Sequence, residues 1–289
     1  MKRKCATLTF FLALFFFAFD SSSLYGQISE GPENGSLLII GGGRLDSVFY
    51  QSFMDEAGGP EAPIVVIPTA GSDDPEKSDP GFERLADAYR KRGFKNVSVL
   101  HASSKEEANA VTFVQKLQAA KGIWFTGGRQ WRLMDAYFET ASYDAFRRVL
   151  ENGGIIAGTS AGATIQGSYL ARGDSKTNTI MMGDHEEGFS FITNIAIDQH
   201  VLRRNRQFDI FEILDAHPEL LGIGLDENTG ILVKGDHFEV VGKSYVLVYD
   251  GTFWHAESNS YKKAAPGERV FHLMKSGQKY HMANWTRVE

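Results

Sequence analysis

A serine between glycines is the residue of this chain best placed to do chemistry, because residues 158–162 read Gly-Thr-Ser-Ala-Gly. The apolar run Ile155–Ala157 before it is typical of a buried strand, and the small residues after it suit the start of a helix. A serine on such a turn exposes its hydroxyl, and free N–H groups of the helix can stabilise an oxyanion. The pattern predicts that Ser160 is a nucleophile. The alternative is a tight turn that only needs its glycines.

A nucleophilic serine needs a base within hydrogen-bond reach, and histidine is the usual one. The chain has eight histidines, and His200 stands out because it follows the apolar run Ile195–Ile197. The end of that predicted strand would present His200 at the same edge of a sheet as Ser160. His101 also follows an apolar run and is the chief alternative.

The acid that orients the histidine is expected after another short apolar strand, Gly222–Leu225. Asp226 and Glu227 both follow it. Successive side chains of an extended chain point in opposite directions, so only one of these carboxylates should face the site. A turn that merely caps the strand end is the alternative for both.

Short apolar runs that alternate with amphipathic segments predict an α/β fold. The predicted strands span residues 37–40, 64–67, 97–100, 123–125, 155–157, 195–197 and 222–225. The predicted helices span residues 82–89, 110–117, 131–138, 143–150 and 208–214. Such a pattern indicates a mostly parallel sheet sandwiched by helices, with ligands at the carboxyl ends of the strands. The glycines at 41, 127 and 158 should therefore share one edge.

From residue 231 onward the pattern changes to short β segments separated by turns. We predict strands at 231–233, 237–241 and 245–249, with edge strands in the tail at 269–274. The polar stretch Arg172–Gly188 is expected to form a loop or hairpin bordering the site. These elements fit one domain, residues 27–289.

The first 26 residues are predicted to be a signal peptide, with a charged start at Lys2–Lys4 and an apolar run at Leu8–Phe19. Cleavage after Gly26 would release a periplasmic or secreted protein with no stable membrane insertion. An uncleaved membrane anchor is the alternative. Cys5 is the only cysteine, so the predicted mature chain has no disulfide, thiolate metal site or cysteine nucleophile.

The formal net charge of −6 is mild, and outside the leader no run of lysine or arginine is longer than the three residues 90–92. This composition argues against nucleic-acid binding. A small peptide or an aspartyl-containing polymer is the expected partner, and a homodimer stays open.

Three stretches in this order, residues 158–163, 198–200 and 222–229, resemble the serine peptidase family that includes cyanophycinase and aspartyl dipeptidase. The resemblance covers about residues 37–249. It implies the flavodoxin-like fold of class I glutamine amidotransferases, with serine in place of their cysteine. It also implies catalysis without a metal or an organic cofactor.

The resemblance implies a triad of Ser160, His200 and Glu227. In α/β-hydrolases the acid precedes the histidine, so this order argues against that fold. The family's Gly-Gly-x-Gln stretch matches residues 127–130. The resemblance thereby assigns the oxyanion hole to the N–H groups of Gly128 and Ala161.

Substrate-binding residues follow from the same resemblance and from the polar side chains around His200. They are predicted to be Gln130, Asp198, Gln199, Arg204 and Arg206. Cyanophycinase-like members carry a third arginine where this chain has Asp209, which is a charge reversal. If Asp209 lines the pocket, it should repel a second acidic group and disfavour polymeric aspartate.

We therefore expect a serine-type exopeptidase or dipeptidase that hydrolyses a peptide or isopeptide bond next to an aspartyl residue. One alternative is a hydrolase that uses the same triad on a non-peptide amide or ester. The other is a non-catalytic binding protein of the cell envelope.

Overall fold

The computed structural model describes residues 31–71 and 75–288 of the 289-residue chain. The predicted signal peptide, residues 1–26, lies outside the described residues. Within the described part of the chain, no helix combines the length and apolar character needed to cross a membrane.

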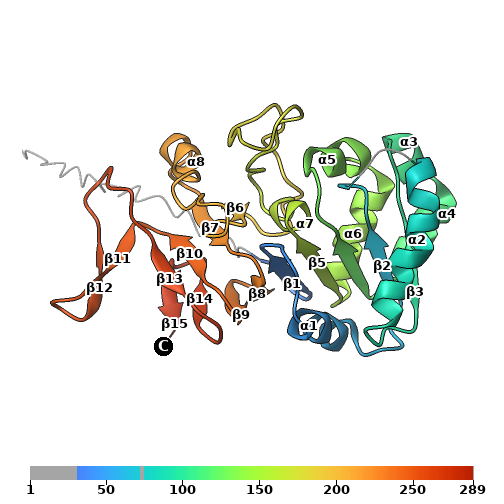
Figure 1. Ribbon diagram of the computed structural model, residues 1–289, viewed down its shortest axis with the longest axis horizontal. Coiled ribbons are helices and arrows are strands. Elements are labelled where there is room, and N and C mark those ends of the chain that lie inside the picture. Colours follow the sequence, from blue (N-terminus) through green and yellow to red (C-terminus); the bar gives the residue numbers. More distant parts are fainter. Residues whose placement is uncertain (1–30, 72–74, 289) are drawn as a thin grey trace, which may run out of the picture.

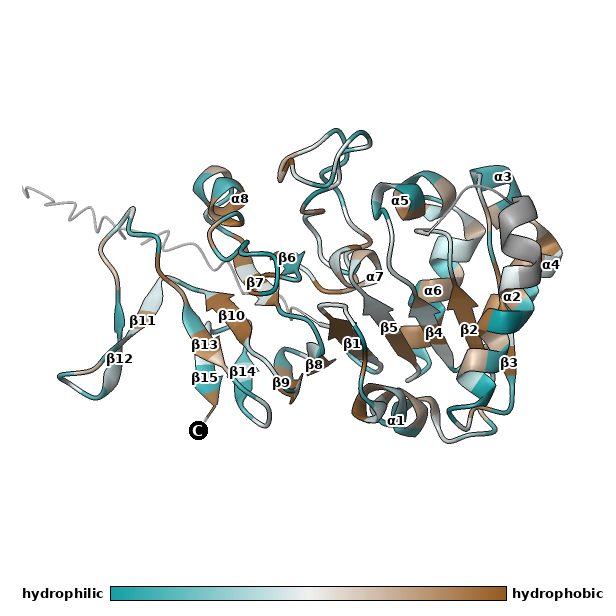
Figure 2. Cartoon of the chain, viewed as in Figure 1, coloured by the Kyte–Doolittle hydropathy of each residue, from teal (hydrophilic) through white to brown (hydrophobic). Residues whose placement is uncertain are grey.

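Five parallel strands form one side of the nine-stranded main sheet, with β3 at its edge (Figure 1). They lie in the order β1-β5-β4-β2-β3 and are β1 (Ser36–Ile40), β2 (Ile64–Ile67), β3 (Val97–Val99), β4 (Gly122–Phe125) and β5 (Ile155–Thr159). Strands covered on both faces must be apolar throughout, which explains the hydrophobic colour of β1 and β2 in Figure 2. Because the strands are parallel, their carboxyl ends meet at one edge.

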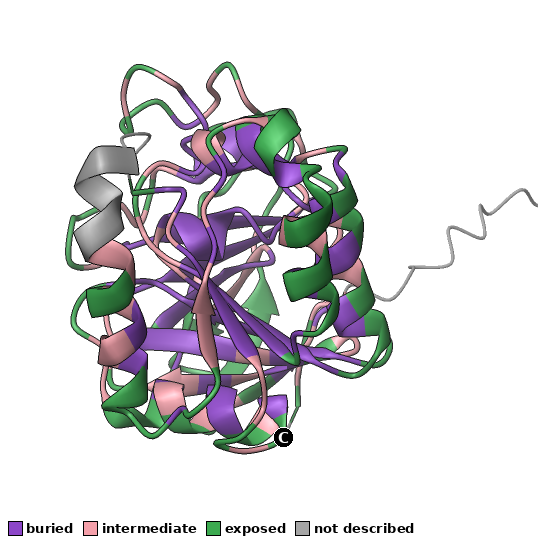
Figure 3. Cartoon of the chain, turned by 90° about the vertical axis from the view of Figure 1, so that its right-hand side faces the viewer, coloured by how far each residue is buried: buried purple, intermediate pink, exposed green. Residues whose placement is uncertain are grey.

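Helices cover both faces of these strands (Figure 3). On one face, α1 (Ser47–Ala57) and α2 (Pro75–Arg90) share a core with Leu38 and Ile40 of β1. The opposite face packs against α4 (Val111–Gln118), α5 (Trp131–Tyr137), α6 (Ala141–Glu151) and α7 (Ala161–Thr164). The short helices α3 (Lys105–Ala108) and α8 (Phe211–Ala216) connect other elements. The alternation of side chains along each strand divides the core between the two faces.

The main sheet is mixed, which corrects the prediction of a mostly parallel one. Four antiparallel strands continue it beyond β1: β8 (Thr229–Lys234), β9 (His237–Gly242), β14 (Lys279–His281) and β15 (Thr286–Val288). The cause is local, because only residues 235–236 separate β8 from β9. A two-residue turn can join antiparallel strands, whereas parallel strands need a long crossover.

A second sheet, in the order β13-β10-β7-β6, packs beside the first. Its strands are β6 (Ile195–Gln199), β7 (Leu221–Leu225), β10 (Val246–Tyr249) and β13 (His272–Met274). β13 lies at the edge, as predicted for the tail, while β11 (Thr252–His255) and β12 (Ser260–Lys263) form a separate hairpin (Figure 1). The strands that precede His200 and Glu227 thus belong to a different sheet from the strand that precedes Ser160.

Candidate active site

Ser160 occupies a strained turn between β5 and α7. Its backbone angles are φ 56° and ψ −112°, a conformation that costs a non-glycine residue about 1–3 kcal/mol. The flanking glycines allow the chain to turn this sharply, because a Cβ at Gly158 would lie 1.9 Å from the carbonyl oxygen of Gly162. The predicted strand, turn and helix are confirmed, and the side chain of Ser160 stays half-buried.

His200 and Glu227 continue from Ser160 as a chain of hydrogen bonds. Nε2 of His200 lies 3.0 Å from Oγ of Ser160, and Nδ1 lies 2.7 Å from Oε1 of Glu227. A proton on Nδ1 donates to the carboxylate and leaves Nε2 free to accept the serine proton. His101, the alternative base, lies elsewhere, with its Nδ1 3.0 Å from Oγ1 of Thr69.

Only one of the two carboxylates, that of Glu227, meets His200, in agreement with the expectation from alternation. While Glu227 faces His200, Oδ1 of Asp226 accepts the backbone N–H groups of Leu202 and Arg203 at 3.2 and 2.8 Å. Asp226 therefore fixes the turn that follows His200. Glu227 thus contacts the His200 side chain, and Asp226 binds the backbone that follows His200.

Gly42 and Gly43, directly after β1, lie against this cluster. Gly42 has a φ of +109°, and a Cβ there would lie 2.5 Å from Cε1 and 2.7 Å from Nε2 of His200. A Cβ at Gly43 would lie 2.7 Å from Oε2 of Glu227. Asn228 fastens this loop, because its backbone N–H donates to the carbonyl of Gly42 at 2.8 Å. The sequence analysis placed the neighbouring Gly41 at this edge of the sheet but did not identify the contact of Gly42 with His200.

Replacing Gly42 with alanine is expected to lower kcat/KM about 100-fold, because the new methyl group takes the place of the His200 ring and small misplacements cost that much. The matched control is Gly58→Ala, since Gly58 also has a positive φ of +98° but no described heavy atom lies within 4 Å of its Cβ position. Both variants share the backbone strain, and only the first should lose activity. Steady-state kinetics and thermal unfolding of both variants make the comparison, and full activity of Gly42→Ala would contradict it.

Burial is the main influence on the charge of His200. It lowers the pKa of the imidazole below the ordinary value of 6.5, and the positive charges of Arg204 and Arg206 act in the same direction. The hydrogen bond and charge of Glu227 oppose this shift without cancelling it. His200 is therefore neutral at pH 7 and can accept a proton.

The acid limb of the pH profile is expected to have its midpoint below pH 6.5, since activity is lost only as the pH falls through the lowered pKa of His200. Arg204→Gln removes a repelling charge, so the pKa should rise and the limb should move to higher pH. Arg203→Gln is the control, because Arg203 is exposed and is not a cause of the shift. The measurement is kcat/KM from about pH 4.5 to about pH 8. A profile of Arg204→Gln that matches the wild type would refute the assignment.

The turn after β4 brings Gly127 and Gly128 to Ser160. A Cβ at Gly127 would lie 3.3 Å from Cβ of Ser160, and a Cβ at Gly128 would lie 1.9 Å from the carbonyl oxygen of Ala70. Ala161 is the first residue of α7, so its N–H has no acceptor within that helix. Gly127 thus lies against Ser160, and the role of the neighbouring Gly128 and of Ala161 in an oxyanion hole stays a prediction.

A buried arginine that the sequence analysis missed holds the segment before His200. Nε and Nη2 of Arg172 donate to the two carboxylate oxygens of Asp198 at 2.8 and 2.9 Å. Nη2 also donates to Asp209 at 2.6 Å. Arg172 and Asp198 are each only 1% exposed. Asp198, predicted to bind substrate, is therefore engaged by the protein itself, and the charge of Asp209 is partly compensated.

The segment between α7 and β6 is anchored by residues that follow β4. Nε2 of Gln130 donates to the carbonyls of Ala171 and Arg172 at 2.7 and 2.8 Å. Nη2 of Arg129 donates to the carbonyl of Asp174 at 2.6 Å. The amide nitrogen of Gln130, another predicted substrate ligand, thus serves to hold this loop.

Two other predicted substrate residues keep polar atoms without a partner. Oε1 of Gln199 and Nη1 of Arg206 are buried, and no described residue forms a hydrogen bond with either atom. Arg204 is exposed to solvent. Buried polar atoms are normally paired, so these two favour a ligand or a bound water beside His200.

Comparison with known proteins identifies the family to which this chain belongs. The sequence model of the family described as Peptidase family S51 matches residues 37–241. A cyanophycinase of Geminocystis herdmanii is 31% identical over 224 residues, which cover 75% of this chain and 80% of the relative. A cyanophycinase of Nostoc sp. is 29% identical over 259 residues, with 86% and 85% covered.

Among solved structures, a peptidase from an acI-B1 Actinobacterium superposes with a TM-score of 0.62 at 24% identity. The match covers 87% of this chain and 98% of that one, and it supports the α/β fold. The family model spans most of the chain and includes the segments that bring Ser160, His200 and Glu227 together. The chain belongs to peptidase family S51 and is a cyanophycinase-like serine peptidase.

Proposed function

We propose that Ser160, His200 and Glu227 are the catalytic triad of this peptidase. The observation that carries the proposal is the unbroken chain of hydrogen bonds from Oγ of Ser160 through the His200 ring to Glu227. Oγ attacks the carbonyl carbon of the scissile bond while Nε2 of His200 takes the hydroxyl proton. The Glu227 carboxylate stabilises the imidazolium that forms.

The tetrahedral oxyanion is bound by the N–H groups of Gly128 and Ala161 in this proposal. When the intermediate collapses, the C–N bond breaks and His200 returns its proton to the leaving amine. Water then attacks the acyl-enzyme with His200 again as the base, which releases the acid product and restores Ser160. The steps balance with one water molecule and the groups of the triad.

We also propose that the substrate presents an aspartyl carboxylate near the scissile bond, as an aspartyl dipeptide or isopeptide does. Nη1 of Arg206 supports this proposal, because it is a buried guanidinium nitrogen without a partner among the described residues. Burial, followed by repulsion from Arg172, lowers the pKa of Arg206, so its charge is incompletely balanced. The fork of a guanidinium suits a carboxylate. The buried Oε1 of Gln199, which also has no partner among the described residues, can accept a substrate N–H.

Wild-type protein is expected to prefer an aspartyl dipeptide over its asparaginyl analogue by about ten- to hundredfold in kcat/KM, since a hydrogen bond to a charged group contributes about 1.5–3 kcal/mol. Arg206→Gln should remove most of this preference, whereas Arg203→Gln, on an exposed neighbour, should keep it. The measurement is kcat/KM for the matched peptide pair in the three proteins. Equal rates for the two peptides in the wild type would reject an aspartyl specificity.

Two experiments test whether Ser160 is reactive and which peptide linkage is cleaved. Labelling of the wild type by an organophosphonate, and its loss in Ser160→Ala, would report an activated serine whatever the substrate is. Hydrolysis of paired α- and β-aspartyl dipeptides, followed by mass spectrometry, would then identify the linkage. Labelling without cleavage of either dipeptide would favour a hydrolase of another amide or ester, and no labelling would oppose the triad.

We also propose a class I glutamine amidotransferase-like fold and export from the cytoplasm. The parallel strands with Ser160 at their carboxyl edge support a class I glutamine amidotransferase-like arrangement within a single domain, residues 27–289. The charged start and the apolar run Leu8–Phe19 support export to the periplasm or beyond. A mature N-terminus near Gln27 in protein from the native host would agree with export, and a full-length cytoplasmic chain would oppose it.

A further inference from the structure

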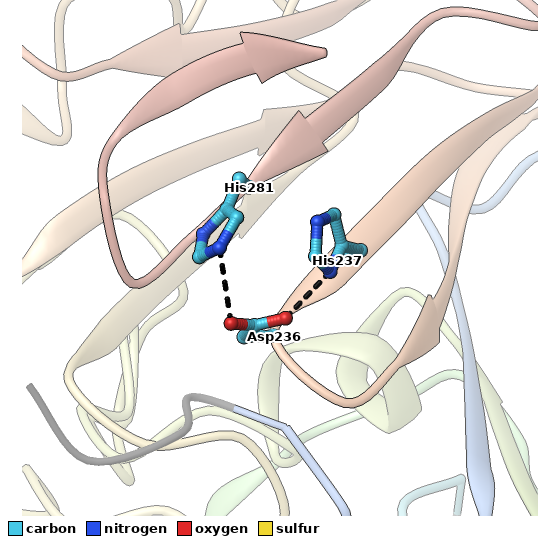
Figure 4. A group of neighbouring side chains, drawn as sticks. All are labelled: Asp236, His237 and His281. Atoms are coloured by element: carbon cyan, nitrogen blue, oxygen red, sulfur yellow. Dashed lines mark ion pairs between the residues drawn. The ribbon is translucent and has the colours of Figure 1, made fainter.

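Three potential metal ligands meet on the antiparallel strands β9 and β14 and the turn before β9, in the part of the main sheet formed by the C-terminal region of the chain (Figure 4). Asp236 lies in the turn between β8 and β9, His237 begins β9, and His281 ends β14. His237 and His281 are direct partners in the antiparallel pairing of these strands. Such partners point to the same face with their Cβ atoms about 4.5–5.5 Å apart, a spacing that lets both imidazoles reach one ion.

The side chains already converge on one point. Oδ1 of Asp236 lies 2.5 Å from Nδ1 of His237, and Oδ2 lies 3.2 Å from Nε2 of His281. The two imidazole rings are 4.3 Å apart between their centroids. The donor atoms of all three residues lie within 4.8 Å of one another. Figure 4 shows the carboxylate below both rings, with one oxygen toward each.

We propose that Asp236, His237 and His281 form a binding site for a divalent transition metal ion such as zinc. Two imidazole nitrogens and a carboxylate oxygen are a ligand set that zinc accepts, with water in the fourth position. Donor atoms of a tetrahedral zinc lie about 3.3 Å apart, given bonds of about 2.0–2.1 Å. The observed separations therefore need only small side-chain rotations to admit the ion.

The charged groups around the cluster do not prevent binding. Lys234 is the partner of His237 on β8, but its Nζ lies 2.6 Å from Glu56. Lys279 likewise faces Glu239 at 3.5 Å. These two lysines thus carry their own counter-ions, and the Asp236 carboxylate remains available to a cation.

Asn284 sets a limit on the affinity. Its side-chain Nδ2 lies 3.2 Å from Nε2 of His281, and its backbone N–H lies 3.2 Å from Nδ1. A metal at Nε2 displaces the first contact and requires the ring proton on Nδ1, which costs the second. With these losses and an open fourth position, we expect a dissociation constant on the order of 1–100 µM, weaker than a closed four-ligand zinc site.

The proposed metal site lies away from the active site and links the β8–β9 turn to β14 within the main sheet. Lys234 pairs with Ser36 at the start of β1, whereas Gly230 pairs with Ile40 at its end, next to the active-site glycines. Asp236 therefore lies at the edge opposite Ser160. Its backbone carbonyl also accepts the N–H of Met282 at 2.7 Å, so a bound ion would reinforce an existing link between the β8–β9 turn and β14.

Isothermal titration calorimetry of the purified protein with zinc chloride tests the proposal. We expect one ion per chain in the wild type, and affinity at least about tenfold weaker in His237→Ala, His281→Ala and Asp236→Asn. The unfolding temperature of the wild type should rise by about 5–10 °C at zinc concentrations about 100-fold above the dissociation constant. The three variants should lose this rise.

Two controls separate this site from other histidines. His255→Ala changes a histidine on the exposed β11–β12 hairpin and should bind zinc as the wild type does. His200→Gln removes the active-site imidazole and should also retain the ion. Absence of zinc binding in the wild type would overturn the proposal, and so would unchanged affinity in folded His237→Ala and His281→Ala, or loss of the ion in His200→Gln.

Discussion

Replacing Ser160 with alanine is expected to lower kcat/KM for an aspartyl dipeptide by about 10⁴-fold or more, since removal of a triad nucleophile leaves only binding and oxyanion stabilisation. The fold should persist, because the substitution removes one half-buried oxygen and keeps the Cβ that the turn already accommodates. Initial rates at saturating and limiting substrate, with circular dichroism of the same samples, provide the measurement.

The members of a triad act as a unit, so the losses of activity caused by their single substitutions should not add. This non-additivity is an internal control for the assignment. His200→Ala should cost nearly as much as Ser160→Ala, and the double variant should be little worse than either. Ser168→Ala is the matched serine control, because Ser168 is also half-buried but bonds the backbone of Ile195. Full activity in His200→Ala would reject the base assignment.

The grouping of the site could be predicted because its signals are local. Ser160, His200 and Glu227 each follow a short apolar strand, and each strand end can be seen in about ten residues of sequence. Alternation alone left Asp226 and Glu227 open, and the choice of Glu227 rested on the family resemblance. In the structure Glu227 contacts His200, and Asp226 accepts a backbone N–H group of the following turn. The order of these residues along the chain also distinguished the family from α/β-hydrolases.

Contacts between distant segments could not be predicted in the same way. The pairing of Arg172 with Asp198 joins a polar loop to a strand end 26 residues away, and no spacing rule connects them. The separation of β6 and β7 into a second sheet likewise depends on packing between faces. By contrast, α1 was missed although Phe49, Phe53 and Ala57 recur at intervals of four residues, a helical signal that was present.

Arg172 changes what is expected of Asp209. From sequence, Asp209→Arg would restore a family arginine and improve cleavage of polymeric aspartate. In the structure Asp209 is an acceptor for Nη2 of Arg172, so an arginine there would place two guanidinium groups side by side. We therefore expect Asp209→Arg to lower stability and not to improve cleavage, a result that urea unfolding and polymer hydrolysis would measure.

Replacing Arg172 with methionine is expected to have the largest effect on stability, lowering the free energy of unfolding by about 3–5 kcal/mol. The reason is that the variant leaves the carboxylate of Asp198 buried without its cation, since both side chains are only 1% exposed. Urea unfolding followed by circular dichroism provides the free energy. Activity measured well below the unfolding transition should also fall, because Asp198 lies two residues before His200 on the same strand end.

The partners of Arg172 determine how this loss can be interpreted. Asp209→Asn should cost much less, about 0–1 kcal/mol, because the side chain of Asp209 is 40% exposed and solvent screens that half of the network. Combining Arg172→Met with Asp198→Asn should recover part of the loss, since the double variant no longer buries an unpaired charge. If the double variant recovers stability but not kcat, the network acts by positioning His200. If Arg172→Met alone is as stable as the wild type, the buried pair does not hold this part of the fold.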